Sequence, residues 1–124
     1  MPDGPREYDR EYLRHLAGPV RIRVGLSTHQ GEVVRFVVQL EYWVDEDWWE
    51  VVRYDHDPDR IHGHDVTADG LHVDVYRIGE KSWTEYVAPP MPPGIALDRA
   101  EDHLSNNLET FISRFERWHE SRNP

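Results

Sequence analysis

The feature that most constrains the fold is a regular alternation of apolar residues in the segment 34–44. The apolar positions are Val34, Phe36, Val38, Leu40, Tyr42 and Val44. Polar residues, among them Arg35, Gln39 and Glu41, stand between them. Successive side chains of a strand point to opposite faces of a sheet, so this period of two predicts a strand. We expect one face of it to lie in the core and the other to be mixed.

A second apolar segment, "WWEVVRYDH", follows the acidic stretch "DED" and predicts a hairpin. A three-residue loop at "DED" places Leu40 opposite Val52. A two-residue loop would instead place Arg53 beside Leu40 on the core face, where an unpaired charge is costly. We therefore expect the three-residue loop, which also pairs Trp43 with Trp49 on the outer face. The residues of the second strand that then face the core are Trp48, Val52, Tyr54 and His56.

Shorter alternations predict further strands at 20–24, 71–76 and 82–88. The sequence "TADG" at 67–70 predicts a hairpin turn in front of the strand at 71–76, because Asp-Gly accommodates the positive φ angles of a tight turn. Together with the central hairpin, these segments predict an antiparallel meander of about five strands.

The C-terminal segment predicts one long amphipathic helix over about residues 99–120. Its apolar residues recur at steps of three and four: Leu97, Ala100, Leu104, Leu108, Phe111, Phe115 and Trp118. Asp98, followed by Glu101 three residues later, is a good N-terminal cap. The proline-rich segment 89–94 predicts a stiff connector to this helix.

The N-terminal segment 6–18 predicts a short helix that ends at Gly18, because its apolar and aromatic residues recur at helical spacing. Residues 1–5 are expected to be disordered. The whole chain, 1–124, is then one α+β domain of two layers: an antiparallel β-meander packed on one long C-terminal amphipathic helix.

The charge balance limits the partners that the chain can bind. It carries 24 acidic and 14 basic side chains, a formal net charge of −10. Non-specific DNA binding rests on a cationic surface, so we do not expect it. No apolar run is long enough for a membrane helix and the chain has no cysteine, so we expect a cytoplasmic protein. The apolar stripe of the C-terminal helix is about as wide as one sheet face, which predicts a monomer.

The candidate site is the stretch "RYDHDPDRIHGHD", which begins at Arg53. His62 and His64 would point to the same side of a strand, so their imidazoles can converge. With His72 beyond the "TADG" turn, they predict a site for a divalent transition metal such as Zn, Ni or Cu. A second hypothesis makes the two histidines a general acid and base on a phosphodiester. Arg53 would then stabilise the developing negative charge, and Asp55 would orient an imidazole or Arg53.

Two further interpretations stay open. Aspartate and histidine are common in solvated turns, so the stretch can equally be a polar loop without a function. The Trp43–Trp49 pair and the acidic loop could instead dock a protein partner, which would make the chain a non-catalytic interaction module.

The segment "FVVQLEYWVDEDWWEVVRYDHD…HGHDV" resembles a family of small uncharacterised prokaryotic domains. These domains share a Q-L-E strand, a tryptophan after the hairpin turn, and R-Y-D followed by a histidine-rich loop. The R-Y-D element with its histidines is also similar, more remotely, to TumE-type toxins of toxin–antitoxin pairs. The matching positions are Arg53, Tyr54, Asp55, His62 and His64.

The resemblance implies a toxin-like protein directed at RNA or a nucleotide, with an antitoxin as its protein partner. We take this as the expected function, with Arg53, Asp55, His62 and His64 as the catalytic residues. The alternatives are a non-catalytic protein-interaction module and a metal-binding protein that uses His62, His64 and His72.

Overall fold

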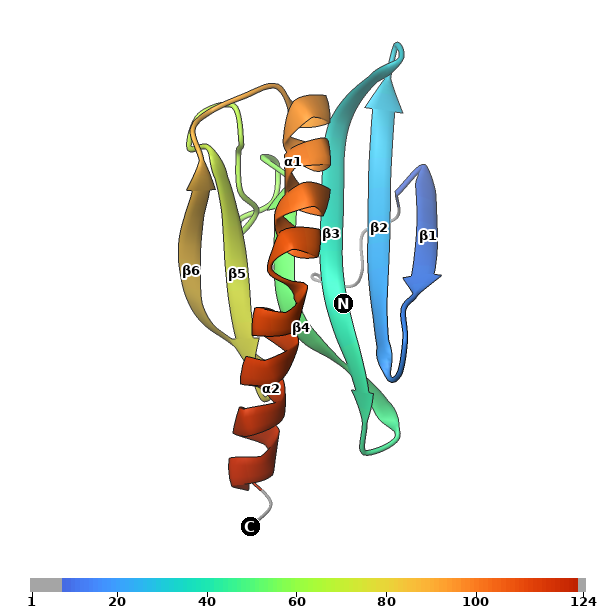
Figure 1. The fold of residues 1–124 in the computed structure, drawn as a ribbon. Helices are drawn as coiled ribbons and strands as arrows, with labels where there is room; N and C mark the ends of the chain where they lie inside the picture. The colour runs from blue at the N-terminus through green and yellow to red at the C-terminus, as the bar shows by residue number, and fades with distance from the viewer. Residues whose placement is uncertain (1–7, 123–124) are drawn as a thin grey trace.

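Six strands form one antiparallel sheet whose order follows the chain, and two helices lie along it (Figure 1). The computed structural model describes residues 8–122. The strands are β1 (Arg10–His15), β2 (Val20–His29), β3 (Glu32–Val44), β4 (Asp47–His56), β5 (Leu71–Arg77) and β6 (Glu80–Ala88). The helices are α1 (Pro93–Asn106) and α2 (Leu108–Arg122). The predicted α+β class and the antiparallel meander are confirmed.

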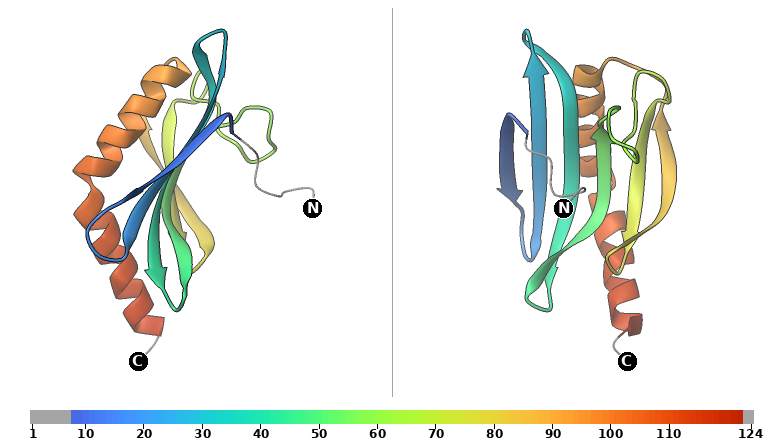
Figure 2. Two further views of the ribbon diagram at one scale, coloured as in Figure 1. Left: turned by 90° about the vertical axis from the view of Figure 1, so that its right-hand side faces the viewer. Right: turned by 180° about the vertical axis from the view of Figure 1, so that it is seen from behind.

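The helices cover one face of the sheet, and the opposite face, which we call the open face, carries no helix (Figure 2). On the covered face, buried apolar side chains of the strands meet those of both helices. The largest fully buried side chains include Tyr54, Phe36, Leu40, Leu71 and Leu104. Burying an aliphatic or aromatic side chain of this size contributes roughly 1.5–3 kcal/mol. The core therefore lies between the helices and the sheet, and the open face is left for polar groups.

The sixth strand is β1, in the segment for which the sequence predicts a short helix. β1 pairs with β2 from Arg10↔Leu26 to His15↔Arg21, and all its residues are exposed. A short helix is marginal in water, whereas the edge of β2 offers unpaired backbone groups to a neighbouring strand. The helix prediction is therefore wrong. The predicted disorder at 1–5 lies outside the described residues.

Three connections are two-residue hairpin loops. Both residues of each loop have positive φ angles, as a type I′ turn requires. The pairs are Gln30 and Gly31 (52° and 82°), Asp45 and Glu46 (55° and 63°), and Ile78 and Gly79 (51° and 79°). This turn type matches the right-handed twist of the flanking strands, so it holds the neighbouring strands in register.

The β3–β4 hairpin combines a two-residue loop with a β-bulge, in place of the predicted three-residue loop. Leu40 pairs with Val52, whereas the next residue, Glu41, pairs with Glu50, so Val51 is the extra residue. The bulge shifts β4 by one residue and restores the predicted register beyond it. A two-residue loop is therefore compatible with an uncharged core face.

Between the loop and the bulge, the two tryptophans of β4 lie on the faces opposite to those predicted. Trp48 pairs with Trp43, and their ring centroids are 5.3 Å apart. Trp49 packs against the core and donates its indole N–H to the carbonyl of Val44. The predictions of Trp48 as a core residue and of Trp49 as the outer partner of Trp43 are wrong, because the loop is one residue shorter than expected.

The predicted single helix is two helices. After α1, the backbone N–H of Asn107 donates to the carbonyls of His103 and Leu104, and its side-chain amide donates to the carbonyl of His103 at 2.8 Å. An asparagine that bonds the backbone in this way competes with the regular helix ladder. The apolar stripe nevertheless continues across the break, from Leu104 to Phe111. Neither helix of the described chain is long and apolar enough to cross a membrane.

α1 begins at Pro93, inside the segment predicted as a connector. Proline is tolerated in a first turn because its missing N–H would have no helical partner there. Pro92 occupies the N-cap position, and no side chain forms a capping hydrogen bond. Asp98 lies within the helix, so its predicted role as the cap is wrong.

Two residue pairs, Val52↔Val75 and Arg53↔Asp74, join β4 to β5. The chain between the two strands, residues 57–70, forms a long loop that projects on the side of the open face (Figure 2). The predicted turn at "TADG" is confirmed, because residues 66–69 form a turn. No strand directly precedes it, so the prediction that this turn closes a hairpin is wrong. This loop brings the histidines of the candidate site back onto the sheet.

Candidate functional site

The segment 57–64 is folded tightly against the end of β4. Its backbone hydrogen bonds run from Asp57 N–H to the His64 carbonyl (2.9 Å), from Arg60 N–H to the Asp57 carbonyl (3.1 Å), and from Gly63 N–H to the Arg60 carbonyl (3.0 Å). A Cβ atom on Gly63 would lie 2.1 Å from the Asp57 carbonyl oxygen, so the approach requires glycine. The loop therefore fixes His64 beside β4.

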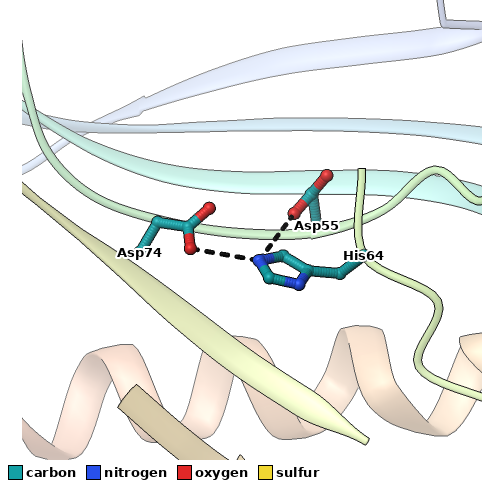
Figure 3. A group of neighbouring side chains, drawn as sticks. All are labelled: Asp55, His64 and Asp74. Atoms are coloured by element: carbon teal, nitrogen blue, oxygen red, sulfur yellow. Dashed lines mark hydrogen bonds and ion pairs between the residues drawn. The ribbon is translucent and has the colours of Figure 1, made fainter. Parts of the chain in front are cut away.

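His64 lies against two carboxylates of the open face (Figure 3). Asp74 of β5 pairs with Arg53 of β4, and Asp55 follows two residues later on the same face of β4. The Nε2 atom of His64 is 3.0 Å from Asp74 Oδ1 and 3.9 Å from Asp55 Oδ1. Asp55 is 5% exposed and Asp74 3%. One imidazole nitrogen therefore faces two buried carboxylates.

Three neighbours orient this group. The hydroxyl of Thr84, on β6, donates to Asp74 Oδ1 at 2.7 Å. Lys81 Nζ lies 3.6 Å from Asp74 Oδ2. His72 stacks on the ring of His64, with centroids 5.4 Å apart and planes inclined by 14°. Asp74 and His64 are thus held by contacts from two strands.

Burial and close contacts shift the protonation equilibria of the three groups. Burial raises the pKa of Asp55, although Arg53 acts to lower it. The hydrogen bond with Asp74 raises the pKa of His64. Burial acts to raise the pKa of Asp74, but the hydrogen bonds from His64 and Thr84 bring it below its usual value. Asp74 is therefore the ionised acceptor, and His64 donates its Nε2 proton to it.

Asp55 and Asp74 belong to a pocket of about 450 Å³ on the open face. The residues that line it are Arg53, Asp55, Arg60, Ile61, His62, Gly63, Asp74, Tyr76 and Lys81. A second cavity, of about 550 Å³, shares Arg53 and Arg60 with it. Among residues 8–122, the guanidinium groups of Arg53 and Arg60 have no ion-pair partner. Both arginines are therefore available to an anionic ligand.

The structure brings three of the four predicted catalytic residues, Arg53, Asp55 and His62, to the wall of this pocket. The fourth, His64, contacts the pocket residues Asp55 and Asp74 with its ring. His62 lies in a turn of the loop and His64 in an irregular segment, so the strand alternation from which their convergence was expected is wrong. His62 is exposed, whereas His64 is half-buried.

The group that could hold a metal ion differs from the predicted set of three histidines. Asp55, His64 and Asp74 each offer one ligand atom, and these atoms lie within 4.8 Å of one another. His72 directs Nδ1 toward the Gly70 carbonyl at 3.3 Å and contributes to the group by stacking. Only His64 is common to both sets.

Asp74 is the site residue that the sequence does not reveal. It occupies a polar position in an alternating strand, where an aspartate is unremarkable. Its place opposite Arg53 depends on the register of β4 and β5 across a long loop. A tight turn would fix the register of the two strands, but a long loop joins them. The apolar pattern within each strand therefore does not predict which residues pair.

The fold and the site define an α+β protein with helices on one face of an antiparallel meander and a charged pocket on the other. A family model described as "Domain of unknown function (DUF7718)" matches residues 6–121, and the chain belongs to this family. No curated protein and no solved structure matches the chain. The family's description names no activity, so the similarity to TumE-type toxins stays a prediction.

Proposed function

We propose that the chain is a toxin-like protein that acts on RNA or a nucleotide, with a phosphate group bound in the pocket of the open face. The observation that supports this best is the pair of guanidinium groups of Arg53 and Arg60. Both line the pocket and the adjoining cavity. Among the described residues neither forms an ion pair within 4.0 Å, although Arg53 acts electrostatically on the nearby Asp55 and Glu50 carboxylates. A guanidinium group matches the geometry of a phosphate and can bind it through two hydrogen bonds.

The size of the two cavities suits this class of ligand. Volumes of about 450 and 550 Å³ lie within the range of small-molecule sites, and together they can accommodate a nucleotide or a short piece of single-stranded RNA. Arg53 and Arg60, shared by both cavities, would bind the phosphate between them. Sugar and base would then extend to either side.

His62 is the residue that we assign to proton transfer. Its imidazole is exposed in the pocket wall, where it can reach a ligand, and imidazole is the commonest general acid–base group. His64 is less suited to this role because its Nε2 proton is donated to Asp74. We therefore assign His64 to holding the pocket together, and His62 to the chemistry.

The test is growth arrest on induced expression, together with cleavage of synthetic single-stranded RNA by the purified chain. The double variant Arg53→Ala/Arg60→Ala should lose both effects. The double variant Arg99→Ala/Arg117→Ala removes the same charge from exposed positions of the two helices and should behave as wild type. Equal activity of all three proteins, or no activity in any of them, would refute the proposal.

A second function is favoured by the aromatic surface at the other end of the sheet. Trp43 is 44% exposed and packs on Trp48, and both border a shallow depression with His15, Gly18 and Pro19. Exposed tryptophans of this kind are common in binding sites for proteins. The test is binding of the product of the neighbouring gene, measured by titration calorimetry. Trp43→Ser should abolish this binding if the chain is an interaction module.

A further inference from the structure

We propose that Asp55, His64 and Asp74 form a binding site for a divalent transition-metal ion at the base of the pocket. The proposal goes beyond the proposed function because it requires no nucleotide. Two carboxylate oxygens and one imidazole nitrogen are a mixed set of hard and borderline ligands, which suits Mn²⁺, Fe²⁺ or Zn²⁺. Mg²⁺ and Ca²⁺ prefer sites made of oxygen atoms alone.

The first argument is convergence. Ligand atoms that are about 2.0–2.2 Å from one metal ion lie about 3.0–3.5 Å from each other in tetrahedral or octahedral coordination. The 3.0 Å separation of His64 Nε2 from Asp74 Oδ1 falls in this range, and the 3.9 Å separation from Asp55 Oδ1 needs only a small closure. Figure 3 shows the same nitrogen directed toward both carboxylates.

The second argument is an unsatisfied buried oxygen. Asp55 is 5% exposed, and within the described part of the chain its Oδ1 atom has no hydrogen-bond partner. The carboxylate receives a backbone hydrogen bond from His64, but a buried oxygen that is left without a partner is still costly. The atom lies on the side of the carboxylate that faces His64, so an ion bound there would supply the missing interaction.

The third argument is the support around the three ligands. The Thr84 hydroxyl donates to Asp74 Oδ1, and the fold of the loop at Gly63 fixes His64. Outer contacts of this kind orient metal ligands and strengthen binding. Asp55 and Asp74 also line the pocket, so an ion between them would keep coordination positions open to water or to a ligand.

The ion would also resolve a conflict in the pocket. Asp55 and Asp74 repel an anionic ligand, whereas Arg53 and Arg60 attract one. A divalent cation neutralises the two carboxylates, and His64 would then turn a lone pair, and not a proton, toward the ion. If the proposed function is correct, the metal and the two arginines would bind the same phosphate.

The experiment is titration of the purified chain with MnCl₂ alone and with ZnCl₂ alone, followed by calorimetry. We expect one ion per chain. Asp55→Asn and His64→Gln should each weaken binding at least tenfold. The controls are Asp69→Asn, at an exposed aspartate of the same loop, and His29→Gln, at an exposed histidine at the end of β2, and both should bind as wild type.

Two further readouts support the test, and the first of them needs no variant. Added Mn²⁺ should raise the midpoint of thermal unfolding of the wild type, because an ion that binds the folded state stabilises it. Electron spin-echo spectra of bound Mn²⁺ should show a coordinated nitrogen in the wild type, and this signal should be lost in His64→Gln.

The proposal is overturned if neither ion binds, if Asp55→Asn and His64→Gln both bind as wild type, or if His62→Gln loses as much affinity as His64→Gln. The last result would restore the predicted set of histidines. The Arg53→Ala/Arg60→Ala variant should keep its metal affinity. Metal binding without any effect on RNA would therefore refute the proposed function and leave the metal site standing.

Discussion

At the scale of single residues, the site depends on a few positions at which another residue type would disturb its geometry. Gly63 lets the loop touch the backbone of Asp57, and this contact places His64. Asp55 and Asp74 are buried on the face of the sheet that no helix covers. Buried carboxylates are rare unless they are paired or bind an ion, so this part of the open face is more than a solvated surface.

Gly63→Ala should disrupt the site without unfolding the domain. The new Cβ atom would lie 2.1 Å from the Asp57 carbonyl, which is backbone and cannot turn away. We expect a loss of about 1–3 kcal/mol in the free energy of unfolding, and altered NMR signals from the His64 ring. The matched control is Gly94→Ala, because the nearest atom to its new Cβ, on Val33, is 4.0 Å away. Unchanged His64 signals in Gly63→Ala would contradict this account of the loop.

His103 should make stability depend on pH. Burial lowers its pKa below the usual 6.5; the negative charge of Glu85 opposes this effect and the positive charge of Arg99 adds to it. The folded state therefore favours the neutral ring. The stability that the neutral His103 ring contributes is fully present above the pKa that this ring has in the unfolded chain. It is lost as the pH falls through the lower pKa that the ring has in the folded protein. Between pH 7.5 and 5.0, urea unfolding of His103→Gln should lose less stability than that of the wild type. If the variant loses more stability than the wild type over this pH range, the pKa of His103 is raised and not lowered in the folded protein.

At the scale of the elements, the patterns within one strand or helix are predictable, and the contacts between elements often are not. The alternation at 34–44 predicts β3, and the stripe from Leu97 to Trp118 predicts the helical layer. β1 could not be predicted from the spacing of its own apolar residues, because this segment becomes a strand by pairing with the edge of β2. The bulge at Val51 cannot be predicted from the sequence for a similar reason. Its position depends on both the type of the β3–β4 turn and the register of the two strands beyond it.

The same limit applies to the site. Arg53, Asp55 and His64 could be selected from the sequence because they stand in one short polar stretch. Asp74 could not, because the pairing of β5 with β4 brings it there across a 14-residue connection, 57–70. Site residues that are close in sequence can be found from local composition. Site residues that strand pairing brings together can be found only when the strand register is known.

The β3–β4 turn should be improved by a glycine. Glu46 has a φ angle of 63°, a left-handed conformation that costs a non-glycine residue about 1–2 kcal/mol. Glu46→Gly removes that cost and keeps the turn type, so we expect the free energy of unfolding to rise by about 1 kcal/mol. The control is Glu85→Gly, at an exposed position within β6, which should lower stability. A less stable Glu46→Gly variant would contradict the assigned turn geometry.

At the scale of the whole molecule, the two faces of the sheet differ in what they carry. The covered face buries the core under α1 and α2. The open face combines buried polar side chains, such as Gln39 and Glu41, with the arginines of the pocket. Arg21 lies 2.6 Å from Glu41, so many of these charges are already paired within the chain. The core and the proposed ligand site thus lie on opposite sides of one sheet.

This division leads to a prediction about the oligomeric state. The apolar stripe of the helices is used within the chain, and Phe115, near its C-terminal end, is only 4% exposed. The open face is charged, which disfavours contact with a second copy of itself. The two edge strands, β1 and β6, carry charged residues that discourage edge-to-edge pairing. We therefore expect a monomer.

Analytical ultracentrifugation should give the mass of one chain at every protein concentration. Phe115→Asp is unsuitable as a probe, because a charge at this buried position would unfold the protein. The informative variant is Leu13→Lys, since Leu13 is an aliphatic residue of the edge strand β1 that is 45% exposed. If the wild type is a dimer and Leu13→Lys dissociates it, then β1 is an interface and the monomer prediction is wrong. That result would leave the pocket on the open face intact.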